Sequence, residues 1–174
     1  MLIVLVAIVI ASIYGVLHDQ VTYSISPEYY TKFKFIQFNL ADAFAAQHMT
    51  QPRSAVVIVG ILATWWMGLC IGIVLALFTL FFREPAAMFP SAIQALGLVV
   101  AVAIIAAVIG GLYGHYQLAK TGVNWWLPGQ LADKPAFITV GAIHNASYIG
   151  GVVGLIFAAL YLLLKNRRLR RQVE

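Results

Sequence analysis

Four long stretches of the chain contain no Asp, Glu, Lys or Arg, and this pattern constrains the fold more than any other feature. A bilayer core about 30 Å thick is crossed by roughly 20 apolar residues of α-helix, and in hydrocarbon only a helix or a closed barrel satisfies its own backbone hydrogen bonds. The uncharged stretches cover residues 1–17, 54–82, 85–119 and 135–164. The sequence therefore predicts an all-α membrane protein, a bundle of four transmembrane helices with spans at about 2–20, 55–82, 90–116 and 137–164.

The composition leaves little room for anything besides this bundle. Charged residues make up 10% of the 174 positions, against about 25% in soluble domains. We expect one membrane domain. The net charge of +5 does not indicate nucleic-acid binding, because five of the eleven basic residues lie in the last ten positions. A basic tail such as 165–174, directly after a span, is typical of an orientation signal or of contact with anionic lipid.

The same tail predicts the orientation of the chain. The first span lacks the basic segment and a convincing cleavage site of a signal peptide, so we expect it to be retained. Four spans place both termini on one side, and the basic tail assigns that side to the cytoplasm. The long connection 20–52 and the shorter one near 117–135 are then extracytoplasmic.

The long connection is predicted to form an amphipathic outer lid over residues 20–52. Apolar and hydroxyl residues alternate over 21–26, as in a short strand, and then Ser26, Pro27 and Glu28 are typical of the start of a helix. Helix and strand compete over 32–35, and a further short helix is expected at 39–48. Aromatic residues beside lysines suit a segment on the outer leaflet or at the mouth of the bundle.

Small residues indicate how the spans pack. Three spans contain pairs of glycines four positions apart, a spacing that lets helix backbones approach closely in lipid. The pairs are Gly68 and Gly72, Gly110 and Gly114, and Gly150 and Gly154. These faces predict a compact bundle, or an interface with another copy or a larger membrane complex. The single cysteine excludes an intrachain disulfide and a cysteine metal cluster.

Three histidines lie near the predicted outer ends of the spans. His18 ends the first span, His115 ends the third, and His144 lies early in the fourth, within the acyl region. Ionisable residues at such depth are costly and therefore mark candidate sites. We expect the three imidazoles to converge at the outer mouth of the bundle, with Asp19 and Glu28 beside them.

Such a cluster predicts a metal site for zinc, copper or iron. His18, His115, His144, Asp19 and Glu28 are the candidate ligands, because imidazole and carboxylate groups are ordinary ligands of these ions. Residues expected to orient the imidazoles are Tyr14, Asn145 and Tyr148.

Other functions remain open from the sequence alone. A b-type haem could be held between His115 and His144. Each histidine could instead form a structural hydrogen bond between helices, in an accessory subunit of a larger complex. Two helical hairpins could also form the halves of a minimal transporter. No motif of a known enzyme class is present, so the sequence assigns no catalytic residue.

Several short motifs together resemble a family of small, uncharacterised bacterial four-span membrane proteins. They are His18-Asp19-Gln20-Val21-Thr22, Glu28-Tyr29-Tyr30, Thr64-Trp65-Trp66 with Gly68, and His144 followed by Ala146-Ser147-Tyr148. The resemblance covers most of the chain and implies a bacterial inner-membrane protein. It implies no activity, cofactor or substrate.

Overall fold

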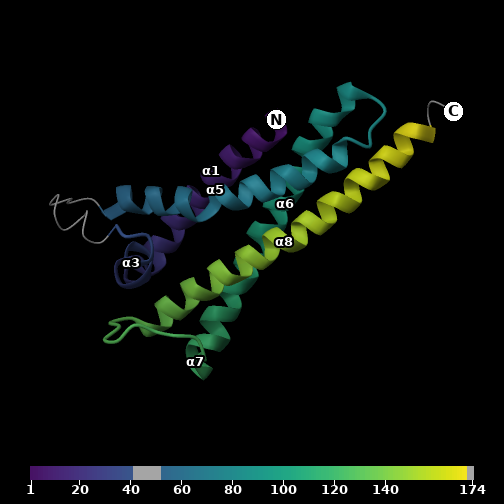
Figure 1. The fold of residues 1–174 in the computed structure, drawn as a ribbon. Coiled ribbons are helices and arrows are strands. Elements are labelled where there is room, and N and C mark those ends of the chain that lie inside the picture. The colour runs from purple at the N-terminus through teal and green to yellow at the C-terminus, as the bar shows by residue number, and fades with distance from the viewer. Residues whose placement is uncertain (41–51, 172–174) are drawn as a thin grey trace.

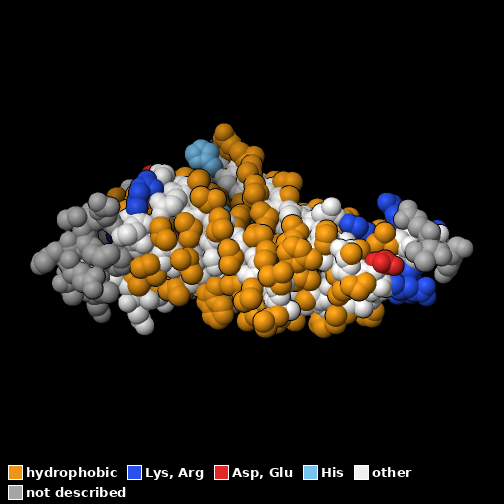
Figure 2. Space-filling model, turned by 90° about the horizontal axis from the view of Figure 1, so that it is seen from above, with side chains coloured by type: hydrophobic (Ala, Val, Ile, Leu, Met, Phe, Trp, Pro, Cys, Tyr) orange, Lys and Arg blue, Asp and Glu red, His pale blue; other side chains and the backbone are white. Residues whose placement is uncertain are grey.

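Four long helices form the protein and confirm the predicted all-α bundle. The structure is a computed structural model that describes residues 1–40 and 52–171. The long helices are α1 (Leu2–Ile25), α5 (Pro52–Thr79), α6 (Pro85–Tyr113) and α8 (Lys134–Arg171). Each is long and apolar enough to cross a membrane. Apolar side chains cover the middle of the visible face and basic side chains gather near its ends (Figure 2).

The bundle consists of two helical hairpins that cross one another. Helix α1 packs mainly against α5, and α6 packs mainly against α8, while contacts between the two hairpins are sparser. Figure 1 shows the crossing, with both termini and the α5–α6 turn toward its top and the α3 and α7 segments at the opposite end. The site described below lies between the hairpins.

Glycines permit the close approach of helices within each hairpin. A Cβ at Gly68 would lie 2.7 Å from the carbonyl oxygen of Ala7, and one at Gly154 would lie 2.9 Å from Cα of Val99. Neither position has room for a side chain. The glycine pairs expected from the sequence therefore serve packing within this chain.

The strand expected at residues 21–26 is wrong, because α1 continues as a helix to Ile25. Two anchors hold this extension. Thr22 donates its hydroxyl to the carbonyl of His18 (3.0 Å), and the Arg53 guanidinium binds the Gln20 side chain (Nη1–Oε1, 3.0 Å) and Ser24 Oγ (3.0 Å). The start of α5 thus fixes the last turns of α1, and no strand forms within the described residues.

A short helical cap follows α1. Ser26 is the N-cap residue and Pro27 the first helical residue of α2 (Pro27–Tyr29), as the sequence predicts. The cap continues through the π-helical η1 (Tyr30–Lys34) and α3 (Phe35–Gln37), so the competition at 32–35 is resolved in favour of helix. We call residues 27–38 the cap. The helix expected at 39–48 lies almost entirely outside the described residues.

The C-terminal end of α6 is extended by the π-helical η2 (Gly114–Leu118) and by α7 (Ala119–Thr121). Two apolar cores enclose the space between the hairpins. One lies toward the termini and includes Leu75, Leu96 and Leu162; the other lies under the cap and includes Tyr30, Val59 and Val140. Polar side chains lie between these two cores.

Candidate metal centre

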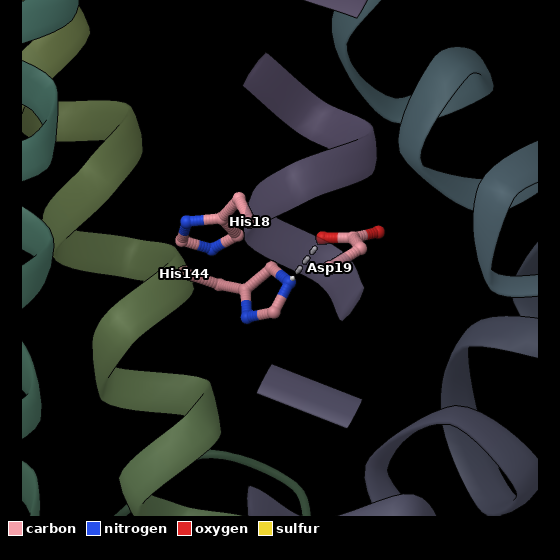
Figure 3. Close-up of side chains that lie close together, drawn as sticks. All are labelled: His18, Asp19 and His144. Carbon is pink, nitrogen blue, oxygen red and sulfur yellow. Dashed lines mark hydrogen bonds and ion pairs between the residues drawn. The ribbon is translucent and has the colours of Figure 1, made fainter. Parts of the chain in front are cut away.

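Two adjacent residues of α1 and one residue of α8 form a buried polar group between the hairpins. Asp19 is 3% exposed and His144 is 4% exposed. One ligand atom from each of His18, Asp19 and His144 lies within 4.8 Å of the others. Figure 3 shows the two imidazoles and the carboxylate gathered between the two helices. We call these three residues the His–Asp–His group.

Helical periodicity places these residues at the crossing. Asp19 lies on the buried face of α1, four residues after Gly15 and three before Thr22. His144 lies on the buried face of α8 with Val140, four residues before it, and Ser147, three residues after it. Positions three or four apart share one face of a helix, so each polar residue belongs to a face that is otherwise small or apolar.

The hydrogen bonds of His144 define the state of its imidazole. Nδ1 lies 3.0 Å from the carbonyl oxygen of Val140 and donates its proton to it, because a carbonyl only accepts. Nε2 of a neutral ring then carries the lone pair. That atom lies 3.2 Å from Oδ1 of Asp19 (Figure 3). A lone pair and a carboxylate oxygen at this separation require a proton or another cation between them.

His18 is held by a chain of hydroxyl groups across the hairpins. Its Nδ1 lies 3.4 Å from the hydroxyl of Tyr14, and that hydroxyl lies 2.6 Å from Oγ of Ser147. When Nδ1 donates to Tyr14 and Tyr14 donates to Ser147, the lone pair of His18 resides on Nε2. The His18 ring also meets the His144 ring edge-on, with 4.8 Å between centroids.

Among the residues that the structure describes, two buried atoms of the group have no hydrogen-bond partner: Nε2 of His18 and Oδ2 of Asp19. Leaving a buried polar atom unsatisfied costs about 1–3 kcal/mol, and more for a charged group. Both atoms are potential metal ligands. The two atoms without partners and the close contact between Asp19 and His144 therefore occur in the same three residues.

The cap covers this group with aromatic rings. Tyr29 stacks on His144 with 4.9 Å between centroids and 29° between planes. The Tyr30 hydroxyl lies 2.6 Å from Oγ1 of Thr22, which joins the cap to α1. Burial raises the pKa of both tyrosines, so they stay neutral phenols. The cap thus shields the group from above α1 and α8 with aromatic rings.

Glu28 does not join the group, although the sequence suggested it as a ligand. Its carboxylate accepts hydrogen bonds from the backbone amides of Ala132 (3.1 Å) and Asp133 (2.8 Å) and pairs with Lys32 (2.6 Å). The bond from Lys32, followed by these amides, lowers its pKa to about 2. Glu28 therefore faces the loop before α8 and fastens the cap to that loop.

His115 also lies outside the group. Its side chain is exposed and its ring meets that of Tyr116 at 4.9 Å. The contact face that continues from α6 into η2 contains Ala107, Gly110 and Gly114. One residue of helix rotates the side chain by about 100° from that face, so His115 points away from it and the expected meeting of three imidazoles does not occur.

The residues expected to orient the imidazoles are placed differently. Tyr14 contacts His18 directly. Tyr148 lines cavities next to the group, and Asn145 is an exposed residue that lines one of them. Sequence reasoning gave no site role to Ser147 and Tyr29, which contact Tyr14 and His144 respectively. The position of Ser147, three residues after His144 on one helix face, was a usable signal; nothing in the sequence indicated that Tyr29 stacks on His144.

Comparisons of the chain with protein-family models, with curated proteins and with solved structures find no match.

Proposed function

We propose that this is an integral membrane protein that binds one transition-metal ion at the His–Asp–His group. The observation that carries the proposal is the contact between His144 Nε2 and Asp19 Oδ1. The other ring nitrogen of His144, Nδ1, already donates its proton to the carbonyl of Val140. A histidine that ligates a metal through one nitrogen commonly donates the other N–H to a carbonyl or carboxylate. His144 has this arrangement, with Nδ1 on Val140 O and Nε2 facing Asp19.

A metal ion satisfies more of the group than a proton does. A proton between His144 and Asp19 would relieve their contact but would leave Asp19 Oδ2 and His18 Nε2 without partners among residues 1–40 and 52–171. An ion can take the lone pairs of both imidazoles and one or both carboxylate oxygens. Bonds of about 2.0–2.1 Å would draw the ligand atoms closer than their present spacing, through small side-chain rotations.

The ligand types favour zinc, iron or copper. Two neutral imidazoles and one carboxylate are used by catalytic zinc sites and by non-haem iron sites, and imidazole also suits copper. Three protein ligands leave at least one position open. The haem alternative gains no support, because His115 is exposed and His144 is enclosed by Tyr29, His18 and Asp19.

The site would lie on the extracytoplasmic side of a bacterial inner membrane. The basic residues of the α8 end and Arg83 in the α5–α6 turn lie at the end of the bundle that holds both termini, and such residues favour the cytoplasm. The cap lies toward the other end (Figure 1), and Tyr29 of the cap stacks on His144 of the group. The metal would then enter from the outer side.

Metal content of the purified full-length chain tests the proposal. The protein is stripped with a chelator, reloaded with Zn²⁺ or Co²⁺ and analysed by elemental mass spectrometry. We expect one ion per chain in the wild type and in His115→Ala, which removes an exposed histidine and serves as the matched control. Asp19→Asn and His144→Ala should lose the ion. Wild-type protein that takes up no ion, or variants that keep full stoichiometry, would contradict the proposal.

A structural role is the competing function. The bond between His144 and Asp19 joins α1 to α8, and hydrogen bonds of this kind hold spans together in membrane proteins. In that case the wild type and both variants would all lack bound metal after reloading. The same experiment therefore separates the two functions.

A further inference from the structure

All three residues of the His–Asp–His group line one cavity between the hairpins. Residues of the four long helices form its walls, and its volume is about 70 Å³. The wall also includes Ile71, Leu96 and Val99, which belong to the apolar core nearer the termini. The cavity therefore reaches from the proposed metal position to apolar side chains inside the bundle.

The wall of this cavity beyond the group is mostly small or apolar. Glycine, alanine, valine, isoleucine, leucine and methionine residues make up most of it. Three of its hydroxyl groups already have partners: Thr64 donates to the carbonyl of Gly60 (2.7 Å), and the hydroxyls of Tyr14 and Ser147 lie 2.6 Å apart. Among residues 1–40 and 52–171, no Lys or Arg lines the cavity. Such a wall favours an uncharged, apolar occupant.

The volume limits the size of that occupant. A cavity of about 150 Å³ with apolar walls binds benzene or xenon. A cavity of about 70 Å³ therefore suits a molecule of only a few atoms. Because all three ligand residues line the cavity, an ion held among them borders it, and three protein ligands leave at least one coordination position open.

We propose that, with Fe²⁺ bound at the group, the cavity holds a small uncharged molecule such as dioxygen at the open metal position. The inference rests on the proposed metal function. Two histidines, one carboxylate and open positions are the ligand set of non-haem iron oxygenases. One atom of a diatomic molecule can bind the ion while the other lies in the apolar space, which disfavours an anion.

An apolar groove on the outside of the bundle gives such a molecule a route from the bilayer. The groove, of about 600 Å³, lies between the hairpins and includes the exposed side chains of Leu17, Val108 and Leu112. Tyr14 and His18 line both the groove and the cavity. Because apolar molecules leave water for hydrocarbon, the groove brings them to the two side chains that border the cavity.

Nitric oxide is the probe that tests the inference. It is an uncharged diatomic molecule like dioxygen, and its complex with Fe²⁺ gives an EPR signal that Fe²⁺ alone does not give. The full-length chain in detergent is stripped with a chelator, loaded with Fe²⁺ under anaerobic conditions, assayed for iron and titrated with nitric oxide. We expect the wild type to give the signal and to reach saturation.

A side chain added at Gly151 tests whether the cavity holds the ligand. Gly151 lines the cavity, and a Cβ there would lie 3.6 Å from the Met67 methyl group, an ordinary contact. Gly151→Leu should retain iron but raise the half-saturating concentration about tenfold or more, the equivalent of about 1.4 kcal/mol. Gly97→Leu is the matched control and should respond like the wild type, because a Cβ at Gly97 meets nothing within 4 Å. Gly151→Val replaces Gly151→Leu, under the same criterion, if that variant loses iron.

The outcomes separate this inference from the metal function. Wild type that binds Zn²⁺ or Co²⁺ but no Fe²⁺, or that binds Fe²⁺ but gives no nitrosyl signal, overturns the inference and leaves the metal function standing. Equal half-saturation in Gly151→Leu and the wild type also overturns it, as does an equal rise in Gly97→Leu, because the ligand then lies outside the cavity. Wild type that binds none of these ions refutes the metal function and this inference with it.

Discussion

The contacts within each hairpin differ in kind from the contacts between the hairpins. Within a hairpin, glycines bring backbones together, as where Gly154 leaves no room for a Cβ beside Val99. Between the hairpins the helices share fewer contacts, and polar side chains such as Asp19 and His144 fill part of the space. Packing within the hairpins therefore provides stability, whereas the interface between them provides the groups that can bind a ligand.

The strongest test of this comparison is a large side chain placed within a hairpin. Gly154→Leu puts a branched side chain where even a Cβ would lie 2.9 Å from Val99, so we expect a loss of about 3 kcal/mol or more in the free energy of unfolding. The midpoint of thermal unfolding in detergent measures it. Gly97→Leu is the control, because a Cβ there meets nothing within 4 Å. Equal midpoints for the two variants would show that packing within the hairpin does not dominate stability.

A metal ion should stabilise the interface between the hairpins by a smaller amount. Ligand present at a hundred times its dissociation constant stabilises the folded state by about 2.7 kcal/mol. Added Zn²⁺ should therefore raise the unfolding midpoint of the chelator-treated wild type, and Asp19→Asn should show no rise. His115→Ala should respond like the wild type because its ring lies outside the group. An identical rise in Asp19→Asn would place the effect elsewhere in the protein.

The sequence predicted the spans and their packing faces because both depend on local properties. Absence of charge over about 20 residues defines a span, and glycines four apart share one face of a helix wherever that helix packs. The four helices and the positions of Gly68 and Gly154 follow from these rules. The predicted helix ends were less accurate than the predicted spans. The extension of α1 to Ile25 depends on contacts with Arg53 of α5, which the sequence of α1 does not reveal.

The pattern of apolar residues does not show which histidines belong to the His–Asp–His group. His115 and His144 both lie near one end of an uncharged stretch of the sequence. Only His144 lies on a packed face of its helix. In a helix that is apolar all round, periodicity does not reveal which face meets lipid. Extending the row of Ala107, Gly110 and Gly114 would have shown that His115 lies one position off the contact face.

The smallest expected effect concerns the bonds of Glu28, which add to the apolar packing that already holds the cap on both hairpins. Glu28→Gln removes the carboxylate that accepts from the amides of Ala132 and Asp133, so these amides should exchange hydrogen faster, as measured by mass spectrometry. Glu84→Gln, which changes an exposed acid in the α5–α6 turn, is the matched control.

The protection that Glu28 gives these amides should also depend on pH. The pKa of Glu28 is lowered from 4.5 to about 2, so the contribution of its carboxylate to stability is present above pH 4.5 and is lost as the pH falls from 4.5 toward 2. After correction for the intrinsic pH dependence of exchange, wild type should approach Glu28→Gln in that range. Unchanged exchange in Glu28→Gln at neutral pH would mean that the aromatic contacts of Tyr29 and Tyr30 hold the cap alone.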